Sequence, residues 1–126
     1  MSLRIDIERR PAAIVFVRLD GRLDTGTYAQ LEKALEPVLA GRPQALLFDM
    51  AGISFVSSMG LRVLFMARKS VEDGGGRMVM THLQPQIAKV LEIAAALPPE
   101  NVFASIEEAD RYLAAMQRKV LEQRKA

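Results

Sequence analysis

The spacing of apolar residues near the start of the chain is typical of strands. Apolar and charged side chains alternate over residues 3–8, which predicts a strand with one face in solvent. Residues 14–19 are almost continuously apolar and predict a second strand, closed by an Asp-Gly turn at residues 20–21. Residues 22–23 allow a short further strand. We therefore expect the chain to begin with antiparallel strands.

Beyond residue 24 the pattern alternates between helical spacing and short apolar runs. The apolar runs predict strands at residues 45–48, 78–81 and 102–103. Helical spacing, with capping and stop signals at the ends, predicts helices at residues 28–39, 61–72, 85–94 and 105–120. The end of the chain, residues 117–126, is expected to fray. Repeated strand-helix units require parallel strands, so we expect an α/β fold, a mixed central sheet of about four to six strands flanked by about four helices.

The composition is that of one ordinary globular domain. The chain has 126 residues, half of them hydrophobic, which is enough for a core in a single domain over residues 1–126. It has no cysteine, which excludes disulfides, thiolate metal sites and cysteine nucleophiles, and fits a reducing cytoplasm. No apolar run approaches the ~20 residues that span a bilayer, and no signal peptide is visible. We therefore expect a cytoplasmic protein without membrane insertion.

The charge of the chain gives little support for a nucleic-acid partner. The formal net charge is only +2. Basic residues gather near the C-terminus, where cations complement the dipole of a helix and usually form a solvated face. No aromatic platform for stacking bases accompanies them. We expect no direct binding to nucleic acid.

Groups for catalysis or metal binding are sparse. The single histidine, His82, is not accompanied by a Gly-x-Ser-x-Gly motif. The glycines at residues 74–76 lack the Gly-Lys-Ser/Thr ending of a phosphate-binding loop and precede a predicted strand, so they indicate a helix stop. Carboxylates are scattered over helix faces, so we expect no metal site and no cofactor. This pattern favours an interaction protein over an enzyme.

The most informative segment lies between the strand at residues 45–48 and the helix expected from Leu61. An aspartate and a glycine break the apolar run, so a short loop is expected between the two elements. Ser57 or Ser58 then lies at or near the helix N-cap, where a hydroxyl satisfies free backbone N–H groups. The same position favours negative charge. A serine there is either a structural cap or well placed to carry a phosphate.

Four segments, in the same order and spanning most of the chain, resemble the STAS domain of the anti-sigma factor antagonist type. They are residues 17–24, 48–61, 84–93 and 103–109. The first contains the Gly-x-Leu-Asp sequence of that family, and the second resembles its central signature. The resemblance implies a STAS fold, in which helices flank a mixed central sheet.

The resemblance also implies partners. A protein of that family binds an anti-sigma factor, often itself a serine kinase, and so releases a sigma factor. Phosphorylation at the start of the central helix ends the binding, and a serine phosphatase restores it. Related domains occur in anion transporters, stress-sensing assemblies and a lipid-transport complex. The alternative expectation is therefore a non-phosphorylated STAS subunit of a transporter or lipid-transport complex.

The signature departs from the usual Asp-Ser-Ser/Thr-Gly at its decisive position. Alignment on Gly60 places Met59, which has no hydroxyl, where the usual phosphoacceptor stands. Ser58 then matches the first serine of the motif, and Ser57 stands in place of its aspartate. Either Ser58 is the acceptor, with Ser57 as the alternative, or the chain binds its partner constitutively. The hydroxyl pair at a helix start favours phosphorylation.

The expected partner surface surrounds this helix start. It combines the start of the second predicted helix with the neighbouring turn and consists of Asp24, Thr25, Ser57, Ser58, Met59 and Arg62. An exposed Met59 would fit an anchor in an interface, whereas a buried one would fill the core. A phosphate here should leave the fold intact and disturb the partner through desolvation and like-charge repulsion.

Overall fold

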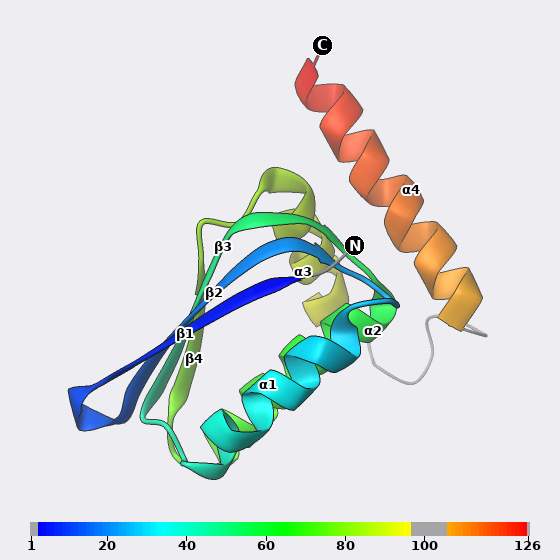
Figure 1. Cartoon of the computed structure of the whole chain (residues 1–126). Helices are drawn as coiled ribbons and strands as arrows, with labels where there is room; N and C mark the ends of the chain where they lie inside the picture. Colours follow the sequence, from blue (N-terminus) through cyan, green and yellow to red (C-terminus); the bar gives the residue numbers. More distant parts are fainter. Residues whose placement is uncertain (1–2, 97–105, 126) are drawn as a thin grey trace.

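The computed structural model describes residues 3–96 and 106–125, and within them four strands form one sheet. The strands are β1 (Arg4–Arg10), β2 (Ile14–Leu23), β3 (Ala45–Val56) and β4 (Arg77–Thr81). They lie side by side in the order β1-β2-β3-β4 (Figure 1). β1 and β2 are antiparallel, whereas β2, β3 and β4 run parallel. The prediction of a mixed sheet is confirmed.

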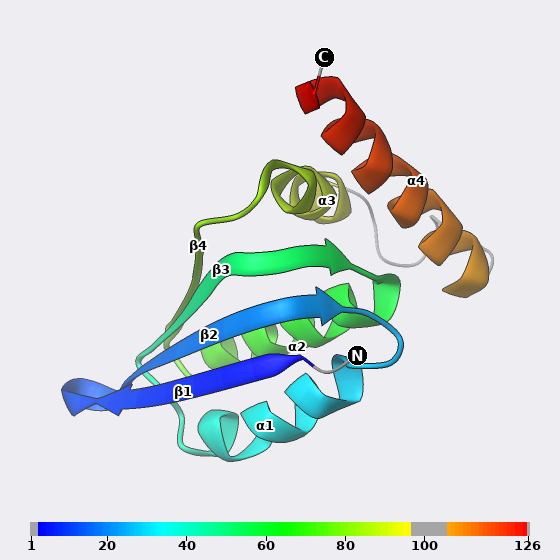
Figure 2. The same ribbon diagram turned by 45° about the horizontal axis from the view of Figure 1, so that its top comes forward.

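The other elements of the described residues are helices and one short 3₁₀ turn. They are η1 (Pro11–Ala13), α1 (Tyr28–Ala40), α2 (Ser58–Asp73), α3 (Pro85–Ala96) and α4 (Ile106–Lys125). α1 and α2 pack against each other on one face of the sheet (Figure 2), while α3 packs against β3 and α4. The α/β order is as predicted. The strand expected at 102–103 and the start of the last expected helix at 105 lie outside the described residues.

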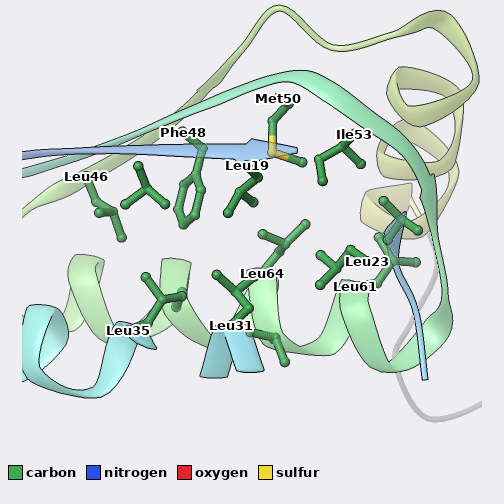
Figure 3. Close-up of a cluster of buried hydrophobic side chains, with 14 of the residues drawn as sticks. Leu19, Leu23, Leu31, Leu35, Leu46, Phe48, Met50, Ile53, Leu61 and Leu64 are labelled. Atoms are coloured by element: carbon green, nitrogen blue, oxygen red, sulfur yellow. The ribbon is translucent and has the colours of Figure 1, made fainter. Parts of the chain in front are cut away.

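The core lies between the sheet and the helix pair α1 and α2. Leu46 and Phe48 point from β3 toward the helices that carry Leu35 and Leu64, and all four side chains are at most 1% exposed (Figure 3). Burial of such a side chain contributes about 1.5–3 kcal/mol. This layer therefore fixes α2 on the sheet and, with it, the position of the serine pair at the start of α2.

β2 is one continuous strand, so the prediction of a turn at residues 20–21 and a separate strand at 22–23 is wrong. The pairing of β2 with β3 is irregular between Arg18 and Asp20 and again between Gly21 and Arg22. Gly21 has a φ of 124°, a conformation that glycine alone adopts readily. Both β-bulges and hairpin turns use a glycine with positive φ, so an Asp-Gly pair is compatible with either. Here the pair lies at an irregularity within the strand and does not reverse the chain.

β3 runs through the segment predicted as a loop and ends only at Val56, so that prediction is also wrong. Asp49 pairs with Arg18 but Gly52 pairs with Asp20, which leaves one extra residue in β3, and a second follows before the strand ends. The spacing of buried positions consequently changes from two residues (46, 48, 50) to three (50, 53, 56). A constant period of two is the sequence signal for a strand, and bulges remove it.

Two helix ends differ from the prediction. α2 begins at Ser58, ahead of the expected start at Leu61, because its first turn is held by the cap described below. α4 continues to Lys125, so the expectation that residues 117–126 fray is wrong for the part of the chain that the structure describes. The side chain of Gln117 is only 2% exposed and bonds to β3, which anchors the second half of this helix.

Candidate functional site

The carboxyl ends of two parallel strands bring the predicted site residues together. β2 ends at Leu23 and leads into the turn before α1, while β3 ends at Val56 and leads into α2. The N–H of Ser57 donates to the carbonyl of Leu23 at 2.8 Å, so the two strand ends are joined directly. Ligands of open parallel sheets commonly bind outside this edge of the sheet.

A glycine allows the start of α2 to approach β2 so closely. A Cβ added to Gly60 would stand 2.7 Å from the carbonyl oxygen of Leu23 and 2.7 Å from its Cγ. Real Cβ atoms do not come this near to backbone oxygen, so no side chain fits at position 60 without displacement. The glycine of the signature therefore sets the distance between α2 and the turn that follows Leu23.

Ser57 is the structural cap of α2. Its side chain is 2% exposed, and its Oγ accepts a hydrogen bond from the N–H of Gly60 at 3.2 Å. Its carbonyl accepts from the N–H of Leu61 at 2.9 Å. Both bonds belong to the start of the helix, which agrees with the expectation that one serine of the pair is an N-cap.

Ser58 and Met59 form the first turn of α2 beyond the cap. Ser58 is the first helical residue and is half-buried, so it is more accessible than Ser57. Met59 is also half-buried. Its exposure is thus intermediate between the two alternatives considered from the sequence, an exposed interface residue and a methionine buried in the core. Arg62 is exposed one turn further along and, at a spacing of four, shares a helix face with Ser58.

The turn after β2 is ordered by its own hydrogen bonds. The hydroxyl of Thr27 donates to the carbonyl of Arg22 at 2.7 Å and accepts from the N–H of Asp24 at 2.9 Å. The carboxylate of Asp24 accepts from the N–H of Gly26 at 3.0 Å. Thr25 is exposed at the tip of this turn. Asp24 and Thr25 are thus held in place beside the start of α2.

The sequence did not indicate Arg22 and Phe55 as neighbours of this site. They pair across β2 and β3, and the guanidinium of Arg22 lies 4.1 Å from the centre of the Phe55 ring. The Arg22 guanidinium also forms an ion pair with Asp24 at 3.5 Å. Their contact follows from the irregular register of the two strands, which no local pattern reveals.

The surroundings of His82 do not resemble a hydrolytic site. The imidazole is exposed, with Nδ1 3.1 Å from the hydroxyl of Thr81 and 3.8 Å from the carboxylate of Asp49. The Thr81 hydroxyl donates to the carbonyl of Phe48 at 3.1 Å, so its proton is already committed to the sheet. In the described ranges no three histidine or carboxylate side chains gather as metal ligands.

A family model for the STAS domain matches residues 4–109, and the chain belongs to the STAS domain family. The resemblance seen in the sequence is therefore confirmed. None of the helices described here has the length and apolar character needed to cross a membrane.

Two proteins similar in sequence to this chain are named as anti-sigma factor antagonists. The chain is 28% identical over 79 residues to a putative anti-sigma factor antagonist, BtrV, of Bordetella bronchiseptica, which covers 63% of this chain and 68% of that protein. It is 24% identical over 95 residues to an anti-sigma F factor antagonist of Paenibacillus polymyxa, with 75% and 80% covered.

The fold is shared with a solved antagonist structure. The unphosphorylated form of the anti-sigma factor antagonist SpoIIAA matches with a TM-score of 0.62 at 21% identity, covering 88% of this chain and 98% of that one. SpoIIAA of Bacillus has also been solved in a phosphorylated form, which matches with the same TM-score of 0.62 over 72% of this chain and 83% of that one. The likeness confirms the predicted STAS fold.

Proposed function

We propose that this protein is a partner-switching regulator that binds an anti-sigma factor through the start of α2. Phosphorylation of Ser58 ends that binding, and a serine phosphatase reverses it. The names of the similar proteins support the partner class. The observation that carries the choice of residue is the division of roles in the serine pair: Ser57 is buried as the helix cap, which leaves Ser58 as the more accessible hydroxyl.

Access favours Ser58 over Ser57 as the acceptor. A kinase must bring the hydroxyl into line with the γ-phosphate of its nucleotide, whereas Ser57 is 2% exposed and its hydroxyl is bound to the N–H of Gly60. Phosphorylation of Ser57 would require the first turn of α2 to open. Ser58 does not make the cap bond to Gly60, so its phosphorylation does not require that bond to break.

The phosphate acts on the partner surface and leaves the fold intact. It adds about −1.5 to −2 charges at pH 7. Negative charge at a helix N-terminus is favourable by roughly 0.3–1 kcal/mol, so α2 tolerates it. The surface formed by Ser58, Met59, Arg62 and the Asp24–Thr25 turn changes its charge, and a partner that packs over it meets desolvation and repulsion.

The partner is an anti-sigma factor that is also a serine kinase, and the exchange takes place in the cytoplasm. The proposal is tested with the kinase-type anti-sigma factors encoded in the native genome, each purified and incubated with the protein, ATP and Mg²⁺. Mass spectrometry locates the phosphate, and titration calorimetry measures binding before and after the reaction. We expect phosphate on Ser58 and at least tenfold weaker binding afterwards.

Matched variants separate the two serines. Ser58→Ala should bind but resist inactivation, whereas Ser57→Ala should still accept phosphate at position 58. Binding with no phosphate on either serine would leave a constitutive binder in place of a switch. Absence of binding to every anti-sigma factor tested would reject the proposed function.

A further inference from the structure

The second half of β3 has an edge without a strand beside it in the described residues. β4 pairs with β3 only from Ala45 to Asp49, while β2 accompanies β3 on the other side as far as Val56. The backbone groups that face away from β2 beyond Asp49 therefore have no strand partner there, and those that are buried, as at Val56, need another partner because unpaired buried N–H and C=O groups are costly.

Three glutamine side chains supply these partners. The amide nitrogen of Gln84 donates to the carbonyl of Ala51 at 2.8 Å, and that of Gln86 donates to the carbonyl of Ser54 at 3.1 Å. Gln84 directly precedes α3 and Gln86 lies in its first turn, and α3 packs beside β3 (Figure 2). The third glutamine, Gln117, comes from α4 and binds at the very end of the strand.

Gln117 makes the most complete of these contacts. Its Oε1 accepts from the N–H of Val56 at 3.0 Å, and its Nε2 donates to the carbonyl of the same residue at 2.9 Å. Two residues of an antiparallel pair exchange the same two bonds, so the side-chain amide takes the place of a neighbouring strand. Gln117 is 2% exposed and Val56 is fully buried, so water cannot replace the amide.

The residue held in this way directly precedes the serine pair. The Val56 backbone is bound by α4 on one side, and the next N–H, that of Ser57, is bound by Leu23 on the other. These contacts together fix the point at which the chain leaves the sheet and enters α2. A shift of the Val56 peptide would move the cap and the hydroxyl of Ser58 with it.

We propose that Gln117 is a positioning residue for Ser58, through which the docking of α4 sets the geometry of the helix start. This inference rests on the proposed function in so far as it names Ser58 as the reacting hydroxyl. It adds that α4, whose Gln117 lies 61 positions after Val56 in the sequence, controls the position of the Ser58 hydroxyl relative to the kinase.

The test compares Gln117→Met with Gln123→Met. Methionine keeps the length of the side chain and suits a helix, so the first variant removes both hydrogen bonds with little change in volume. Gln123 lies on an exposed part of the same helix and serves as the control. In Gln117→Met we expect the Val56 amide to exchange hydrogen about tenfold faster or more. The amide NMR signals of Gly60 and Leu61 should shift as well, while Gln123→Met matches the parent protein.

A kinetic measurement distinguishes positioning from general stability. With the kinase that phosphorylates the parent protein, Gln117→Met should lose several-fold in kcat with a smaller change in KM, at a temperature where both proteins are folded. Gln117→Glu, whose carboxylate accepts from the Val56 N–H but places a buried charge against the Val56 carbonyl, should lose at least as much in kcat as Gln117→Met. Unchanged signals at Gly60 and Leu61, or an unchanged kcat, would overturn the proposal. If no kinase acts on the parent protein, the proposed function fails, and the NMR comparison still decides whether Gln117 positions the helix start.

Discussion

Gly60 of α2 lies against the carbonyl oxygen of Leu23, the last residue of β2, at a distance that leaves no room for a Cβ. A methyl group on Gly60 would stand 2.7 Å from that oxygen. The contact is backbone against backbone, so it cannot be relieved by turning a side chain. It therefore fixes how close the first turn of α2 lies to the turn that carries Asp24 and Thr25.

Gly60→Ala should consequently destabilise the protein. Alanine normally favours a helix over glycine by about 1 kcal/mol, so a loss of about 1–3 kcal/mol here would reverse the usual sign. Urea denaturation measures the change. Gly74→Ala, at the other end of α2, is the control, because a Cβ there meets backbone oxygens at 3.5 and 3.6 Å, which is ordinary contact. Equal stability of the two variants would contradict the steric argument.

Substitution of the two serines by alanine should separate capping from signalling. Ser57→Ala removes the cap and leaves the N–H of Gly60 without its bond, at a cost of about 0.5–2 kcal/mol. Ser58→Ala should cost less than Ser57→Ala, since Ser58 does not make the N-cap bond to Gly60 and alanine is well suited to a first helical turn. Thermal and urea unfolding of both variants measure the difference, and a larger loss from Ser58→Ala would reverse the assigned roles.

Ser58→Asp should weaken binding to the anti-sigma factor while the fold remains intact. The carboxylate places a single negative charge where the phosphate would add more, so the effect should be partial, roughly tenfold in Kd. Ser58→Asn is the matched control, because the amide has the same shape without the charge. Calorimetric titration of both variants gives the comparison, and equal affinities would show that shape and not charge disturbs the partner.

Met59→Ala should weaken the partner complex without preventing phosphorylation of Ser58. The side chain is half-buried beside the serine, so its truncation removes apolar contact from the expected interface. Met66→Ala is the control, since Met66 is 53% exposed two turns further along α2. Affinity and phosphorylation rate are measured on both variants. A Met59→Ala protein that binds as the parent does would remove Met59 from the partner surface.

The sequence predicted those parts of the fold in which spacing is regular. α1 and α3 begin where their apolar stripes and caps indicate, and β4 ends at Thr81 as expected. The errors lie at the bulges: the Asp-Gly pair at 20–21 resembled a turn, and the interruption of the apolar run by Asp49 and Gly52 resembled a loop. Both errors share a cause, since a strand with extra residues loses the period that identifies it.

The sequence located the candidate site, but it did not show which of the two serines caps the helix and which is more accessible. A serine pair before a helical apolar pattern indicates a cap, yet local sequence cannot say which serine makes the bond to Gly60. Gln117 fell in the segment expected to fray because chain ends commonly do, and its partner, Val56, is 61 positions away, where local sequence gives no sign of it. The available signal was a polar residue on the apolar stripe of α4, which is typical of a buried hydrogen bond.

The bond that caps α2 is made by Ser57, so a change at position 58 does not remove it. Because the helix start is closed by the preceding residue, a substitution at position 58 that suits a first helical turn should keep the bond between Ser57 and Gly60. Related chains could therefore diverge into switchable, permanently active and permanently silent versions by a single substitution. Selection on regulation would then act at one codon, with little cost to the rest of the protein.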